Sequence, residues 1–200
     1  MKPSPSTLLR AGGSVALALV SSAAQAHTGH GTTGLFEGLA HPLGLDHLLA
    51  MVAVGLWSVS ALPAHKAWWG PAIFMASLMV SAALGAAGLS VPYLEHMISL
   101  SVVLFGTMLV LHRQTMPTAL GLGVVALAAA LHGLAHGAET PASGFASYAA
   151  GFLLATAGLH FGGVVAGLTI RRYVAANAPL VVAGFGALCG GAGLYLFAQL

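Results

Sequence analysis

Residues 41–59 read HPLGLDHLLAMVAVGLWSV, in which two histidines, an aspartate and a proline open a run that is otherwise almost wholly apolar. Over the full chain of 200 residues, 58% are hydrophobic and only 5% are charged. A soluble domain of this size could not cover so much apolar surface with so few polar side chains. The composition therefore predicts an all-α integral membrane protein, because helices satisfy their own backbone hydrogen bonds in lipid.

The first 26 residues have the layout of a secretory signal peptide. Lys2 and Arg10 flank the start, a short apolar run follows, and the small-residue sequence AQA ends the segment. An uncleaved anchor helix is the alternative, but residues 11–24 fall short of the roughly 20 that span a bilayer. We therefore expect cleavage after Ala26 and a single transmembrane domain over residues 27–200.

Six apolar segments follow, separated by connections that contain Pro or Gly with polar residues. They predict a six-transmembrane-helix bundle with short loops. Glycines spaced four apart in the fifth and sixth spans predict that these two helices form the most closely packed pair. The predicted spans are 35–60, 68–89, 93–112, 117–137, 144–170 and 177–199.

The charged residues predict an orientation for this bundle. Every Lys and Arg after the signal peptide falls in the first, third or fifth connection, whereas Glu37, Glu95 and Glu139 fall at the opposite ends of the spans. Cytoplasmic connections carry the excess of Lys and Arg. The pattern therefore predicts that both termini of the mature chain lie outside the cytoplasm.

Ionisable side chains within membrane helices are costly and are most often functional. In the first span these are His41, Asp46 and His47, and Pro42 among them favours the first turn of a helix. If the helix starts at Pro42, His41 lies at its mouth and the helix dipole favours an ionised Asp46. The alternative is a helix that begins near Leu35 and kinks at Pro42.

The fourth and fifth spans add further histidines. His132 and His136 are four residues apart, about 40° around a helix, and Glu139 lies within about 20° of His132. His160 falls near the middle of the fifth span. A single histidine there can equally form a hydrogen bond between helices, and a histidine pair four apart can arise by chance.

Together these residues form one candidate metal pathway from the outer face toward the bilayer centre. Imidazole nitrogen and carboxylate oxygen suit borderline divalent ions such as Ni²⁺, Co²⁺, Zn²⁺ or Cu²⁺. Such ligands release an ion more readily than thiolates do. The candidate metal ligands are His41, Asp46, His47, His132, His136, Glu139 and His160.

Three motifs, HPLGLDHLLAMVAVGLW, HGLAHGAE and GLHFGG, occur in this order on the six predicted spans. Their arrangement resembles the HupE/UreJ family of hydrogenase and urease accessory permeases. The resemblance implies a secondary transporter of the bacterial inner membrane that carries nickel, sometimes cobalt, for metalloenzyme assembly. It also implies roles for the candidate metal ligands, and no permanently bound cofactor.

One feature departs from that family's usual pattern, which has five residues between the first histidine and the aspartate. Here only PLGL lies between His41 and Asp46. Removing one helical residue rotates His41 by about 100° relative to Asp46. The change is harmless if His41 precedes the helix and disruptive if it lies within a continuous one.

The leading hypothesis is thus a nickel permease and not an enzyme, whose partners are the metal ion and the bilayer, without nucleic acid. Two other functions fit a membrane protein with paired histidines. One is a histidine-box di-iron oxidase, and the other is an electron-transfer protein with a bis-histidine haem. The sequence does not decide the metal, the driving force or whether the chain forms a homo-oligomer.

Overall fold

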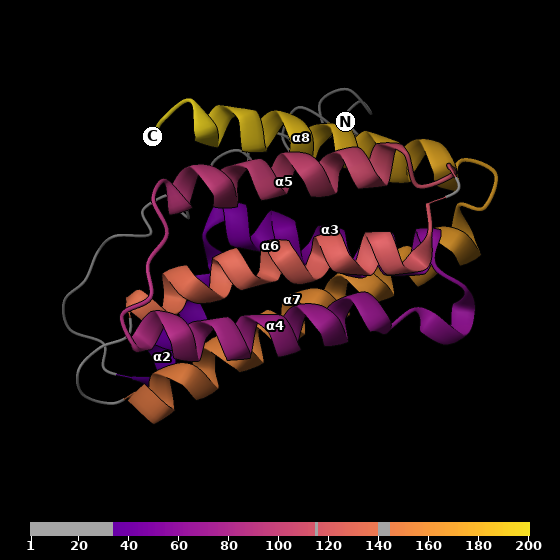
Figure 1. Ribbon diagram of the computed structural model, residues 1–200. Helices are drawn as coiled ribbons and strands as arrows, with labels where there is room; N and C mark the ends of the chain where they lie inside the picture. Colours follow the sequence, from indigo (N-terminus) through magenta and orange to yellow (C-terminus); the bar gives the residue numbers. More distant parts are fainter. Residues whose placement is uncertain (1–33, 115, 140–144) are drawn as a thin grey trace, which may run out of the picture.

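The computed structural model describes residues 34–114, 116–139 and 145–200, and these residues form helices with no strand (Figure 1). The all-α prediction is therefore confirmed for the described part of the chain. The predicted signal peptide lies outside it, so its cleavage stays a prediction. The α-helices are α2 (Leu35–Ala40), α3 (Leu45–Ala61), α4 (Trp69–Ala86), α5 (Leu94–Val110), α6 (Thr118–Ala138), α7 (Phe145–Tyr173) and α8 (Ala178–Phe197).

Four helical segments in the described residues are long and apolar enough to cross a membrane. They are Ala64–Ala86, which includes α4, and the helices α6, α7 and α8. Helices α2 and α3 meet the same criterion only as a pair, and α5 is a shorter apolar helix of 17 residues. The structure thus gives four candidate spans, or five if α2 and α3 count as one, and the six-span count stays a prediction.

The first predicted span, 35–60, is broken near its N-terminal end. Helices α2 and α3 meet at 76°, joined by the 3₁₀ turn η1 (His41–Leu43). Pro42 has no N–H to donate, and Gly44 leaves the helical conformation with ψ 144°. The chain is helical from Leu35, as the second alternative expects, but the helix is interrupted at residues 41–44 and a new helix begins at Leu45, so neither alternative describes this span fully.

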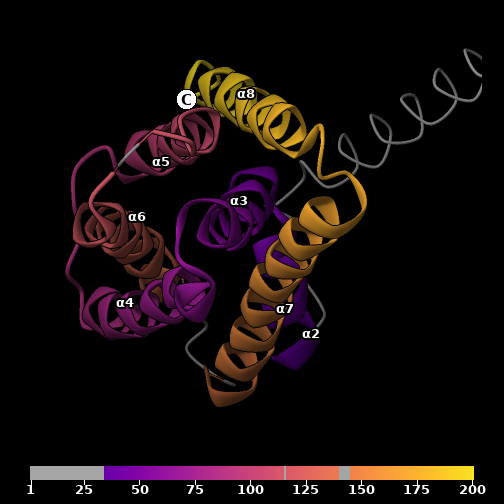
Figure 2. The ribbon, with the colours of Figure 1, turned by 90° about the vertical axis from the view of Figure 1, so that its right-hand side faces the viewer.

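Helix α3 lies at the centre of the bundle, surrounded by the other helices (Figure 2). It contacts α4, α5, α7 and α8, and most of its side chains are buried. Around it, α4 packs along α6, α5 packs along α8, and α2 packs on α7. Because α3 carries Asp46 and His47 in its first turn, this central position brings both side chains inside the bundle.

The expected close pairing of the fifth and sixth spans is wrong. Helices α7 and α8 touch only slightly, and those of their glycines that make close contacts make them with α2, α3 and α5. A Cβ added to Gly163 of α7 would meet the carbonyl oxygen of Val52 in α3. One added to Gly186 of α8 would lie 2.6 Å from the carbonyl oxygen of Gly106 in α5. Small residues do mark the close contacts, but their spacing does not reveal the partner helix.

The basic residues of the described segments gather at one end of the bundle. Helices α3, α5 and α7 all end there, and α4, α6 and α8 start there (Figure 1). Lys66 lies between α3 and α4, Arg113 follows α5, and Arg171 donates a 3.1 Å hydrogen bond to the carbonyl oxygen of Val59. This separation of charge matches the predicted pattern, whereas the direction of the bundle in a membrane stays a prediction.

Candidate metal-binding site

The candidate site lies at the end of the bundle opposite these basic residues, where α3 begins and α6 ends. The break at Pro42 leaves His47 in the first turn of α3, on its inward face. His132 and His136 occupy the last two turns of α6. His47, His132 and His136 are all buried.

Two glycines of α6 set the direction in which its histidines point. A Cβ added to Gly133 would meet the carbonyl oxygen of Leu78, and one added to Gly137 would meet that of Ala82. The glycine face of α6 is therefore pressed against α4. Each histidine precedes a glycine by one residue, about 100° around the helix. Close packing on α4 thus turns the histidine stripe toward the centre of the bundle.

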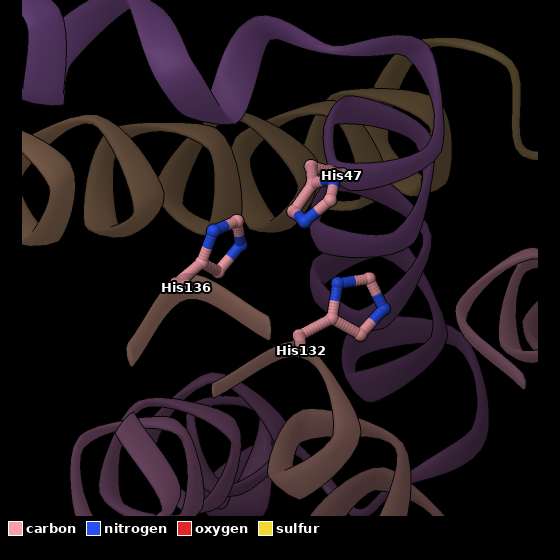
Figure 3. Close-up of side chains that lie close together, drawn as sticks. All are labelled: His47, His132 and His136. Carbon is pink, nitrogen blue, oxygen red and sulfur yellow. The ribbon is translucent and has the colours of Figure 1, made fainter. Parts of the chain in front are cut away.

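Three imidazoles meet at that point (Figure 3). The ring centroid of His47 lies 4.7 Å from that of His132 and 4.4 Å from that of His136. One ring nitrogen from each of these residues lies within 4.8 Å of those from the other two. Two nitrogens bound to one ion at about 2.1 Å can be at most about 4.2 Å apart. Small side-chain movements therefore bring all three nitrogens to bonding distance of a single ion.

Each of the three histidines has a buried ring nitrogen without a hydrogen-bond partner among the described residues. These atoms are Nε2 of His47, Nδ1 of His132 and both ring nitrogens of His136. A buried polar atom left unpaired is destabilising, and such atoms are rare in folded proteins. Unpaired nitrogens that converge from separate helices are what an ion-binding site requires.

The carboxylate of Asp46 holds the ring of His47 in place. Nδ1 of His47 lies 2.7 Å from Oδ1 of Asp46, which also accepts a 2.8 Å hydrogen bond from the His47 backbone N–H. A carboxylate on one ring nitrogen fixes the tautomer and leaves the other nitrogen as the ligand. Asp46 therefore lies behind His47, and its negative charge stays next to the cluster.

His41 joins the site from outside α3. Its ring lies 4.7 Å from the ring of His136, and its Nε2 lies 3.3 Å from a carboxylate oxygen of Glu139. His41 is in η1, before the helix that carries Asp46. The shortened spacing between His41 and Asp46 is thus the harmless alternative, because no continuous helix connects them.

The exposed fraction of the site's side chains falls from Glu139, at the surface end of the site, toward the centre of the bundle. The side chain of Glu139 is 43% exposed, that of His41 22% and that of His47 10%. His132 and His136 are fully enclosed by protein. The candidate ligands therefore form two overlapping sets that extend from the surface into the bundle. The sets are His41, His136 and Glu139, and His47, His132 and His136, so they share His136.

His160 lies apart from both sets. Its Nδ1 bonds the carbonyl oxygen of Thr156 at 2.8 Å, and its buried Nε2 has no partner among the described residues. The ring of Phe74 packs against both His160 and the cluster, 4.7 Å from the ring of His160 and 5.8 Å from that of His132. His160 therefore belongs to neither ligand set, and Phe74 is a neighbour that it shares with His132.

Several residues around the cluster were not predicted as part of the site. Glu95 lines a cavity of about 60 Å³ together with His41, Asp46 and Glu139. Phe152 packs against His136 with ring centroids 4.4 Å apart. Ser101, Phe74 and Tyr148 also contact site histidines. The sequence predicted Glu95 at the same end of the bundle, but no pattern showed that α5 would bring it beside α3.

The fold and this cluster define a helical membrane protein with an internal histidine and carboxylate site. The family described as HupE / UreJ protein matches residues 15–196 of the chain. Protein HupE of Rhizobium leguminosarum bv. viciae is 41% identical over 181 residues, covering 88% of this chain and 92% of that protein. The chain therefore belongs to the HupE/UreJ family, as its motifs predicted. No solved structure matches it.

Proposed function

We propose that this protein is a permease that carries Ni²⁺, and Co²⁺ as a second substrate, across the bacterial inner membrane into the cytoplasm for hydrogenase or urease maturation. Membership of the HupE/UreJ family and the likeness to HupE support the accessory and transport role. The apolar helices support transport through a membrane. The choice of metal is supported by the ligand chemistry of the site.

The single observation that carries this proposal is the buried meeting of three unpaired imidazoles. Nitrogen atoms of His47, His132 and His136 converge inside the bundle, on residues drawn from α3 and α6. Imidazole ligands suit Ni²⁺, Co²⁺, Cu²⁺ and Zn²⁺, whereas Mg²⁺ and Ca²⁺ prefer all-oxygen sites. A site of this kind selects a borderline transition metal against the far more abundant hard cations.

Carboxylates at the mouth would draw a cation toward the cluster. Asp46, Glu95 and Glu139 border the same small cavity. Neutral histidines do not compensate the charge of a divalent ion, so nearby carboxylates are needed to bring that charge into a region of low dielectric constant. Entry through His41 and Glu139 would be followed by transfer to His47 and the α6 histidines.

His136 is the residue through which this transfer would occur. It belongs to both ligand sets, and both its ring nitrogens are without partners among the described residues. An ion held by His41, His136 and Glu139 could therefore exchange its outer ligands for His47 and His132 while it stays bound to His136. Passage beyond the cluster to His160 would go past the ring of Phe74, which contacts both His132 and His160.

Neither enzymatic nor haem chemistry gains support from a specific observation. The three rings are packed at centroid distances of 4.4 to 4.7 Å, and the cavity beside them has a volume of about 60 Å³. That space holds a few water molecules. It supports an ion or its hydration waters as the occupant of this cavity, while a second cavity of about 180 Å³ that His136 also lines has a largely apolar lining.

Metal flux into liposomes that contain the purified full-length protein tests the proposal. Ni²⁺, Co²⁺, Zn²⁺ and Cu²⁺ are compared at equal concentration, with and without a pH gradient, and empty liposomes serve as the control. We expect Ni²⁺ flux well above that of empty liposomes and smaller Co²⁺ flux. Flux equal to that of empty liposomes for every metal would overturn the proposal.

A further inference from the structure

Ser101 of α5 contacts a ring nitrogen of the cluster directly. Its side chain is buried, and its hydroxyl oxygen lies 3.0 Å from Nε2 of His132. The same oxygen lies 2.7 Å from the carbonyl oxygen of Ile98, three residues earlier in α5. Ser101 therefore connects the α5 backbone to one specific nitrogen of a candidate ligand.

These two contacts determine where the protons lie. A serine hydroxyl has one proton to donate, and a carbonyl oxygen can only accept. The short contact with Ile98 is favourable only if the Ser101 proton points to that carbonyl, because two oxygens without a proton between them repel. The lone pairs of Ser101 are then left to accept a hydrogen bond, which Nε2–H of His132 donates.

A neutral imidazole carries a proton on only one ring nitrogen. With the proton on Nε2, His132 has its free lone pair on Nδ1, the atom that is buried without a partner among the described residues. One ring nitrogen of His132 faces His47 and the other points away from the cluster (Figure 3). The hydrogen bond to Ser101 thus agrees with the direction in which the ring presents its lone pair.

We propose that Ser101 is a positioning residue of the metal site, which holds His132 in the Nε2–H tautomer and makes Nδ1 the atom that binds the ion. The cluster then uses two different tautomers. His47 is held at Nδ1 by Asp46 and offers Nε2, whereas His132 is held at Nε2 and offers Nδ1. The part of this inference that concerns metal binding rests on the proposed function. The tautomer of His132 depends only on its hydrogen bond with Ser101.

Metal binding gives the first test. Ni²⁺ binding to the purified full-length protein is measured by equilibrium dialysis for the wild type, Ser101→Ala and Ser101→Thr. Loss of an outer hydrogen-bond partner of a ligand histidine typically weakens metal binding by about 10- to 100-fold. We expect a loss of this size for Ser101→Ala and recovery with Ser101→Thr, which keeps the hydroxyl.

Ser99→Ala is the matched control. Ser99 lies in the same helix, is buried to the same extent, and donates a 3.0 Å hydrogen bond to the carbonyl oxygen of Glu95. No contact joins its hydroxyl to a site histidine among the described residues. Nickel affinity should therefore stay within about twofold of wild type, and equal affinity losses for Ser99→Ala and Ser101→Ala would overturn the proposal.

The tautomer of His132 is read directly from the metal-free protein by ¹⁵N NMR of labelled histidine rings, which distinguishes protonated from unprotonated nitrogens. The His132 signals are assigned by their loss in His132→Gln. We expect Nε2–H alone in the wild type and a mixture of tautomers in Ser101→Ala. An Nδ1–H tautomer in the wild type would overturn the inference, even if Ser101→Ala did not fold. Absence of nickel binding by the wild type would instead count against the proposed function.

Discussion

Nδ1 of His47 lies 2.7 Å from a carboxylate oxygen of Asp46, its neighbour in the chain, at the first turn of α3. Adjacent residues of a helix normally point about 100° apart, so this contact depends on the position of both at the helix start. The break in the chain around Pro42 creates that start. A proline and a glycine in the sequence thus place a carboxylate directly behind a candidate metal ligand.

This contact predicts a graded response at Asp46. Asp46→Asn keeps an oxygen that can accept from Nδ1–H of His47 but loses the charge, whereas Asp46→Ala loses both. Nickel uptake by cells should therefore fall in the order wild type, Asn and Ala, with about a 10- to 100-fold loss for Ala. Glu37→Gln is the control, because Glu37 lies in α2 and does not line the cavity. Equal uptake by the wild type, Asp46→Asn and Asp46→Ala would show that the contact between Asp46 and His47 is not needed for transport.

The close packing of α6 on α4 gives a second prediction. In Gly133→Ala the new methyl group would collide with the carbonyl oxygen of Leu78, so α6 must shift and move His132 out of place. Gly123→Ala lies in the same helix, in open space. It should be tolerated, because Ala favours a helix over Gly by about 1 kcal/mol. Nickel binding should be lost only in Gly133→Ala, and retention of wild-type affinity there would show that the contact does not orient the histidine.

His41 should act in capture and not in the later steps of transport. It lies at the exposed mouth with Glu139, and the deeper set of three histidines does not include it. His41→Gln should therefore raise the nickel concentration needed for half-maximal uptake, while the maximal rate stays near that of the wild type. A fall in the maximal rate alone, with an unchanged half-saturating concentration, would place His41 elsewhere in the pathway.

His160 should be needed for transport but not for binding at the cluster. His160 belongs to neither ligand set, so His160→Gln should leave nickel affinity at the histidine cluster within about twofold of wild type and lower the flux by about tenfold or more. His96→Gln is the control, since His96 contacts only Tyr93 and Phe197 among the ring contacts of the described residues. Wild-type flux in His160→Gln would show that His160 is not part of the transport pathway.

The sequence predicted the residues of the cluster better than it predicted their surroundings. Asp46 and His47 are adjacent in the chain, and His132 and His136 share a helix face, so local periodicity was enough to group each pair. The meeting of the two pairs depends on how α3 and α6 are arranged in the bundle. Apolar composition does not specify that arrangement, because lipid and protein interiors favour the same side chains.

The same limit explains what the sequence could not show. Ser101, Phe74 and Glu95 each come from helices whose partner in the bundle was unknown until the structure placed them. A serine or phenylalanine in an apolar helix carries no pattern that distinguishes a contact with a ligand from ordinary packing. The incorrect pairing of the last two helices has the same origin, since glycine spacing marks a close contact without naming the partner.

The central claim is that the buried histidine cluster holds the transported ion, and His136 tests it most directly because it belongs to both ligand sets. Nickel binding and liposome flux are measured on the same preparations of wild type, His136→Gln and the control His112→Gln, whose residue follows α5 at the opposite end of the bundle. The account predicts that His136→Gln loses both binding and flux, while His112→Gln keeps both. Nickel flux at the wild-type rate through His136→Gln would contradict it.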